Sequence, residues 1–209
     1  MSTEEYLKEK YNFHFNEVTS RTFYKNKKEE EFEILKNYKF NSIKRELTNN
    51  SIKTNVSELR SRLESDFVSK YNPFEDYFYN LPKWDGKDHI QELCNTIKTT
   101  NDEDCFWAFK KWLVAFVSCA INPEVTNQTI FILTGGQGIG KTTWLKKLVP
   151  NKLKNYFFSG EVNPTNKDTT LLMTEKILVN LDELASLNKR QLESFKEMVT
   201  KSVITERRA

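Results

Sequence analysis

The sequence has little cysteine, glycine, proline or histidine. Its 209 residues include three cysteines, six glycines, five prolines and two histidines. Cys94, Cys105 and Cys119 form no C-x-x-C pair, and only His14 and His89 could complete a metal site, which argues against zinc. We expect the three thiols to be reduced and partly buried, as in a cytoplasmic protein.

Long apolar runs are also missing. No stretch approaches about 18 apolar residues, which argues against a membrane span. The first residues show no basic region followed by an apolar core, so we expect no secretory signal and predict a cytoplasmic protein. A net charge of +3 neither requires nor excludes nucleic acid as a partner, because a polyanion could still bind a local basic patch.

The chain divides by pattern into three predicted domains, 1–70, 71–125 and 126–209. Alternating aromatic residues at 11–24 predict a β-hairpin. Apolar residues at helical spacing follow, and Ser42 and Asn55 are the expected N-caps of two helices. The connection at 72–88 is predicted to be irregular because it contains Pro82 and Gly86. The predicted helices are 41–48, 56–68, 88–98, 103–121, 141–149 and 189–200, and the predicted strands of a parallel sheet are 129–134, 156–158 and 176–181.

The most informative motif lies at residues 135–142, which read GGQGIGKT and complete the pattern G-x-x-x-x-G-K-[ST] after the apolar run 130–133. Glycines let backbone N–H groups approach phosphate oxygens, Lys141 can reach the β- and γ-phosphates, and Thr142 can bind Mg²⁺. The alternative is a glycine-rich turn that matches by chance. The predicted nucleotide-binding residues are Gly135, Gly136, Gln137, Gly138, Ile139, Gly140, Lys141, Thr142 and Thr143.

A second motif follows the apolar strand predicted at 176–181. Asp182 and Glu183 come directly after it, where strand ends of an open α/β sheet reach the ligand crevice. Asp182 could hold the water shell of Mg²⁺, and Glu183 could deprotonate an attacking water. The alternative is an acidic helix cap. Candidate arginines for the charged transition state, each otherwise a surface charge, are Arg190, Arg207 and Arg208.

Basic residues also gather in the N-terminal region. Lys25, Lys27 and Lys28, with aromatic residues nearby, could contact nucleic acid. The alternative is a solvated loop beside a packed hairpin, with no role in binding, and we favour this alternative from the sequence.

These motifs together resemble the virulence-associated E (VirE) proteins, in the version common in Bacteroidetes. Those proteins are ATPases of bacterial mobile elements and prophages, similar to superfamily-three helicases and often joined to primase modules. The matching segments are 11–19, with YNFHFNEVT, then NPFxxY at 72–77, LPxWDGKD at 81–88, the glycine-rich loop, and NLDEL at 180–184.

The resemblance implies an α/β fold, an AAA+-like P-loop NTPase with an incomplete sheet, behind a mostly helical N-terminal region with a small hairpin. It assigns Lys141 and Thr142 to Walker A and Asp182 and Glu183 to Walker B, with Glu183 as the catalytic base. ATP and Mg²⁺ are the implied ligands, and single-stranded or forked DNA and a homo-oligomeric ring the implied partners. Family members continue to a further strand with a polar sensor, so we expect this chain to be C-terminally truncated.

Three functions remain open from the sequence. The first is an ATP-dependent DNA helicase or translocase. The second is a nucleotide-gated DNA-binding or regulatory module that binds ATP without productive hydrolysis. The third is a nucleotide kinase, disfavoured by the Asp182–Glu183 pair and by the lack of an arginine-rich lid.

Overall fold

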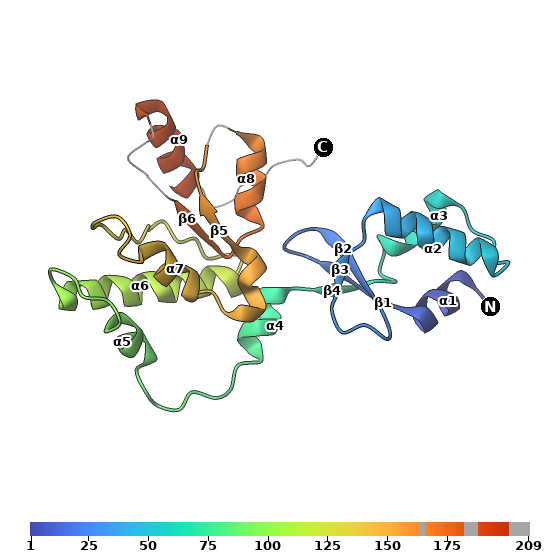
Figure 1. Ribbon diagram of the computed structural model, residues 1–209, viewed down its shortest axis with the longest axis horizontal. Helices are drawn as coiled ribbons and strands as arrows, with labels where there is room; N and C mark the ends of the chain where they lie inside the picture. The colour runs from blue at the N-terminus through green and yellow to red at the C-terminus, as the bar shows by residue number, and fades with distance from the viewer. Residues whose placement is uncertain (164–165, 182–187, 201–209) are drawn as a thin grey trace. The chain divides into compact units, whose positions relative to one another are not determined.

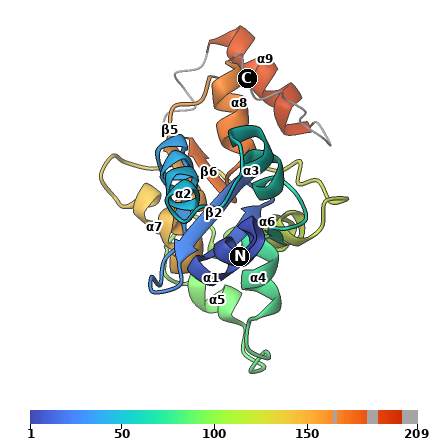
Figure 2. The same ribbon diagram turned by 90° about the vertical axis from the view of Figure 1, so that its right-hand side faces the viewer.

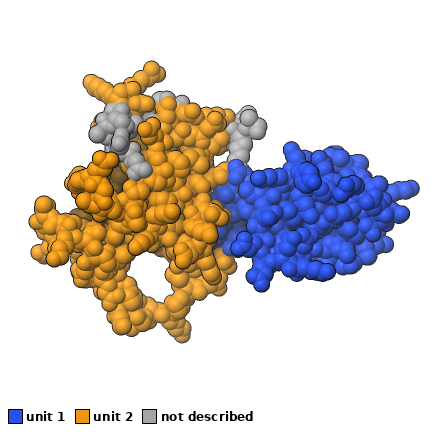
Figure 3. Space-filling view, in the orientation of Figure 1, with its two compact units in different colours: residues 1–73 blue, residues 74–209 orange. Residues whose placement is uncertain are grey.

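The computed structural model describes residues 1–163, 166–181 and 188–200. Backbone contacts divide the chain into two compact units, Met1–Pro73 and Phe74–Ala209, called the N-terminal and C-terminal units below (Figure 3). The three-domain division at 70 and 125 stays a prediction.

The N-terminal unit contains a four-stranded sheet with the order β3-β2-β1-β4. β1 (Tyr11–Asn16) and β2 (Arg21–Asn26) pair antiparallel, so the hairpin predicted from alternating aromatic residues is confirmed. β3 (Glu33–Ile34) extends the sheet beyond β2, and β4 (Ser69–Tyr71) pairs parallel with β1.

Three helices lie together on one side of this sheet (Figures 1 and 2). They are α1 (Thr3–Lys10), α2 (Asn37–Asn49) and α3 (Val56–Leu63). Their apolar residues and the inner face of the hairpin form one core. Its most deeply buried members, at 0–2% exposure, are Leu7, Ile43, Leu47, Leu59 and Leu63.

The predicted caps of these helices have different outcomes. Asn55 is the N-cap of α3, since its side chain accepts a 2.8 Å hydrogen bond from the Glu58 backbone N–H. The Ser42 prediction is wrong, because α2 begins at Asn37 and the Ser42 hydroxyl donates to the Tyr38 carbonyl inside the helix. α1 was not predicted, although Ser2 and Glu5 form the reciprocal capping box that marks its start.

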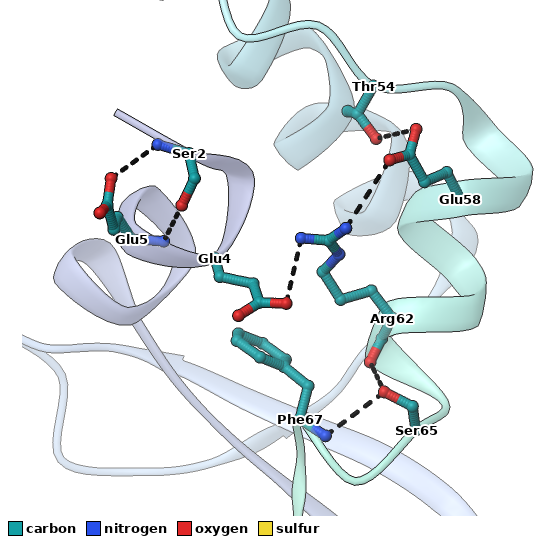
Figure 4. A network of polar contacts seen from close by, with 8 residues as sticks. All are labelled: Ser2, Glu4, Glu5, Thr54, Glu58, Arg62, Ser65 and Phe67. Atoms are coloured by element: carbon teal, nitrogen blue, oxygen red, sulfur yellow. Dashed lines mark hydrogen bonds and ion pairs between the residues drawn. The ribbon is translucent and has the colours of Figure 1, made fainter.

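Arg62 connects α1 with α3 through two ion pairs (Figure 4). One of its terminal nitrogens lies 3.2 Å from Glu4 of α1, and the other lies 3.6 Å from Glu58 of its own helix. Its backbone carbonyl also accepts a 2.7 Å hydrogen bond from Ser65, one turn before β4. This arrangement joins the first helix to the segment that enters the last strand.

Arg62→Ala is expected to destabilise the N-terminal unit by about 1 kcal/mol or less, since partly exposed ion pairs contribute little. The specific contribution of the Glu4 contact follows from a double-mutant cycle with Glu4→Ala, for which we expect a coupling of about 0.5 kcal/mol in denaturant unfolding. Additive effects of the two substitutions would contradict a direct link.

In its described residues, the C-terminal unit contains helices and one short parallel pair of strands. β5 (Phe157–Gly160) and β6 (Leu178–Leu181) pair in parallel, and α8 (Lys167–Thr174) connects them as a β-α-β crossover. The other elements are α4 (Pro73–Tyr79), α5 (His89–Cys94), α6 (Asp102–Ile121), α7 (Lys141–Lys147), the 3₁₀ helix η1 (Asn151–Tyr156) and α9 (Lys189–Thr200).

Two sequence predictions are corrected in this unit. The segment 129–134, predicted as a strand, has no regular secondary structure and lies outside both sheets of the described residues. A strand needs a partner for its backbone groups, and β5 and β6 pair with each other instead. The connection at 72–88 begins with the short helix α4, for which Pro73 suits the first position, and is irregular only afterwards.

Across the described ranges, no helix is long and apolar enough to cross a membrane.

Candidate functional site

The glycine-rich loop at 135–140 turns through backbone conformations that other residues rarely adopt. Gly138 and Gly140 have φ angles of +79° and +91°, in the left-handed region. Gly140 is also the N-cap of α7, and it has no side chain that could cap the first N–H groups of the helix. A Ser or Asp at this position would accept hydrogen bonds from those N–H groups, so with Gly140 they are better placed to donate to an external acceptor.

The Ile139 side chain packs against the start of the loop at Gly135. A Cβ atom placed on Gly135, whose φ is +146°, would lie 2.9 Å from Ile139 Cδ1. The Ile139 side chain therefore folds back over Gly135, while 65% of its surface stays exposed. This packing gives Ile139, a variable position of the motif, a role in the shape of the loop.

Lys141 is held inside the curve of the loop. Its Nζ donates hydrogen bonds of 2.9 Å to the Gly135 carbonyl and 2.7 Å to the Gly136 carbonyl. The ammonium group is thereby placed against the backbone that the motif predicts to surround phosphate. Gln137, Thr142 and Thr143 are exposed, with the two threonines on the first turn of α7 beside Lys141.

These residues fit a nucleoside triphosphate with its cation. The loop offers left-handed glycines, a fixed ammonium group and first-turn N–H groups, which suit phosphate oxygens. The exposed Thr142 hydroxyl is of the type that such sites use to bind Mg²⁺.

An aromatic cluster around the buried Phe109 supports both flanks of the loop. Phe109 of α6 is fully buried, and its ring centroid lies 5.3 Å from Phe131, before the loop, and 5.3 Å from Trp144, after it. Trp112 of the same helix packs 5.6 Å from Phe131. Phe109 thus connects the two ends of the loop through long-range ring contacts.

Trp144 makes a further contact that fixes α7. Its indole Nε1 donates a 2.8 Å hydrogen bond to the Thr96 hydroxyl, which follows α5. The helix that carries Lys141 is therefore fixed against α6 by ring packing and against the end of α5 by a hydrogen bond.

Of the second predicted motif, the structure describes the strand as far as Leu181. Asp182 and Glu183 lie outside the described residues, so their proximity to Lys141 stays a prediction. Just before them, Asn180 Nδ2 donates a 2.8 Å hydrogen bond to Ser159 Oγ, in register across β6 and β5. This polar pair at the carboxyl ends of the parallel strands was not predicted from the sequence.

The remaining candidates are basic residues. Arg190 is exposed in the first turn of α9, and Arg207 and Arg208 lie outside the described residues. Lys25 is half-buried on β2, whereas Lys27 and Lys28 are exposed after it, in the N-terminal unit.

The segment 84–92, which leads into the first turn of α5, is held by local polar contacts. Gly86 has a φ of +87°, Trp84 Nε1 donates to the Lys87 carbonyl at 2.8 Å, and Asp85 accepts from the Lys87 N–H at 3.1 Å. His89 lies 3.0 Å from Glu92 and 2.9 Å from Asp85, and these partners raise its pKa. Because the folded-state pKa is raised, this contribution to stability is present at low pH and is lost as pH rises through that pKa.

Cys94 and Cys105 are neighbours on α5 and α6, with sulfur atoms 3.9 Å apart. Burial, and then the contact with Cys105, raises the pKa of the Cys94 thiol. All three cysteines are free thiols, with Cys94 buried and the other two half-buried. In the described part of the chain, no three His, Cys, Asp or Glu side chains are grouped so that they could hold a metal ion.

Fold and site together define a protein of mixed helices and strands with a glycine-rich loop that encloses its own lysine. A family model for the virulence-associated protein E-like domain matches residues 79–209, more than half of the chain. The chain therefore belongs to the virulence-associated protein E-like family. This membership indicates a replication protein associated with a mobile element or prophage. A search of curated proteins finds no match to the chain.

Proposed function

We propose that this chain is the ATP-binding and hydrolysing part of a DNA helicase or translocase of a mobile element or prophage. The observation that carries the proposal is the position of Lys141, whose ammonium group lies within hydrogen-bond distance of the Gly135 and Gly136 carbonyls. The motif and the left-handed glycines around it add the backbone geometry that phosphate groups need.

The proposed fold is an AAA+-like P-loop domain. Support comes from the parallel pairing of β5 and β6 across α8, the connection used in α/β nucleotide-binding sheets. In that fold the carboxyl end of β6, which Asn180 and Leu181 form, leads into the acidic pair at 182–183.

In the proposed reaction the chain positions phosphate groups and neutralises their charge. Lys141 leaves the loop carbonyls for the β- and γ-phosphate oxygens of ATP, where its charge offsets the negative charge of the transition state. Glu183 orients the attacking water and accepts its proton. Thr142 and Asp182 would hold Mg²⁺, which would supply further charge neutralisation.

The proposal is tested by ATP turnover of the full chain with and without single-stranded DNA. We expect hydrolysis that single-stranded DNA stimulates, and we expect Glu183→Gln to lower turnover by about 10²-fold or more while ATP still binds. Glu193→Gln, at an exposed glutamate of α9, is the matched control and should leave turnover unchanged.

Two other results would each reject part of the proposal. Tight ATP binding with negligible turnover in both variants would favour the nucleotide-gated regulatory module. Turnover that is indifferent to DNA and survives Glu183→Gln would reject both the motor and the assignment of the base.

A further inference from the structure

The sheet of the N-terminal unit has two faces of different character. Side chains alternate along each strand, so Phe13 and its partner Tyr24 share one face while His14 and its partner Phe23 share the other. The first face is built into the core with all three helices of the unit. The second face carries a separate group of rings.

These rings, His14, Phe23, Phe32 and Tyr71, are called the aromatic face below. His14 lies at the centre and stacks on Phe23 with a centroid distance of 5.2 Å and an interplanar angle of 12°. Phe32 and Tyr71 lie 4.3 Å and 4.7 Å from the His14 ring. Four separate segments of the chain therefore bring their rings together on one side of the sheet.

The aromatic face is accessible. Phe32 is 37% exposed, and the other three rings are half-buried. Burial lowers the pKa of His14, so its imidazole is neutral at neutral pH and behaves as an aromatic ring. Partly exposed, mutually oriented rings of this kind offer flat surfaces on which planar groups can stack.

Positive charge accompanies the rings. Lys25 Nζ lies 4.9 Å from the centre of the Phe32 ring and donates to the Glu30 carbonyl at 3.3 Å. No acidic residue is among the strand positions that share this face, which are Asn12, His14, Asn16, Arg21, Phe23, Lys25, Ile34, Ser69 and Tyr71.

Of the acidic side chains near this face, Glu29 and Glu33 have partners elsewhere, whereas Glu30 and Glu31 are exposed in the loop directly before Phe32. Glu33 is in register with Tyr24 and accepts a hydrogen bond from the Tyr24 hydroxyl, so it belongs to the core side. In the loop after β2, Glu29 bonds to the backbone and side chain of Asn26, and the loop also carries the exposed Lys27 and Lys28. The strands therefore present rings and cations together.

We propose that the aromatic face binds single-stranded nucleic acid, with bases stacked on the rings and Lys25 beside the backbone phosphates. Every base has a planar face that can stack on an aromatic ring, but a duplex hides those faces, which favours a single strand over a double helix. The proposal rests on the N-terminal unit alone and is independent of ATP binding at Lys141.

The test measures binding of the full chain, without nucleotide, to a fluorescent oligo(dT) of about 16 nucleotides by anisotropy. We expect Phe32→Ala and His14→Ala each to weaken binding by about fivefold or more, the equivalent of one lost stacking contact. Phe32→Trp should restore it. Tyr38→Ala, which removes an 87% exposed ring from α2, is the matched control and should bind like the unchanged protein.

A salt series tests the role of charge. Lys25→Gln should reduce the slope of log affinity against log salt by about 0.7, the effect of one phosphate contact on a single strand. Lys53→Gln, at an exposed lysine between α2 and α3, should leave the slope unchanged. The same measurements with oligo(U) show whether the chain prefers ribose or deoxyribose. Weaker binding of the variants to either oligonucleotide supports the proposal.

Two outcomes would overturn it. One is equal affinity of Phe32→Ala, His14→Ala and Tyr38→Ala, with circular dichroism showing that all three are folded. The other is binding of a duplex as tight as that of the single strand. Lys141→Ala should retain oligonucleotide binding, so failure of the ATPase proposal and failure of this one can be told apart.

Discussion

Lys141→Ala is expected to weaken ATP binding by about 10- to 100-fold and to lower turnover by about 10²- to 10³-fold. The first figure reflects loss of a hydrogen bond to a charged group, and the second reflects loss of a charge aimed at the transition state. In the structure this ammonium group is already held in the loop by the Gly135 and Gly136 carbonyls. Titration calorimetry and steady-state ATP hydrolysis measure the two effects separately.

The matched control is Lys146→Ala, at an exposed lysine on the same helix, α7. It removes an equal charge without touching the loop and should change neither affinity nor turnover. Lys141→Arg should not restore activity, because a forked guanidinium does not fit the place of a compact ammonium group. ATP binding of Lys141→Ala that equals that of Lys146→Ala would contradict the assignment of the loop.

Phe109→Ala is expected to destabilise the C-terminal unit by about 3–5 kcal/mol, the usual cost of emptying a fully buried phenylalanine site. Total domain stability is about 5–15 kcal/mol, so the effect is a large part of the whole. The cavity would lie between Phe131 and Trp144, and ATP binding should weaken as well, although Phe109 belongs to α6 and not to the loop.

Chemical denaturation followed by circular dichroism measures this loss. Trp107→Ala on the same helix removes a larger ring that is 62% exposed and stacked under Lys111, so it should cost about 1 kcal/mol or less. Equal destabilisation by the two substitutions would show that Phe109 does not support the loop as the ring distances suggest.

Local chemistry made some elements predictable from sequence. The hairpin follows from alternation, and the N-cap of α3 follows from Asn55, because each needs only near neighbours. The capping-box residues Ser2 and Glu5 would have identified α1 by the same reasoning. α9 was predicted with its observed bounds, Lys189–Thr200, from its apolar spacing.

Long-range pairing was not predictable in the same way. The residues at 129–134 have strand composition, yet a strand also depends on a neighbour in space, and none of the described strands pairs with them. The contacts of Phe109 with Phe131 and Trp144 depend equally on tertiary structure. At the candidate site, the glycine conformations and Lys141 were accessible from the motif, whereas the Asn180–Ser159 pair needed the strand register.

Trp144 also gives the loop an optical probe of its own. Its indole is packed on Phe109 and hydrogen-bonded to Thr96, and it lies one turn after Lys141 on α7. Any shift of α7 changes the polarity around this indole and therefore its emission. The exposed Trp84 and Trp107 emit from an aqueous environment, and Trp112, which packs in the same cluster as Trp144, is replaced by Phe so that the remaining change in emission reports on Trp144. Ligand arrival at the loop can thus be followed by intrinsic fluorescence, without a label.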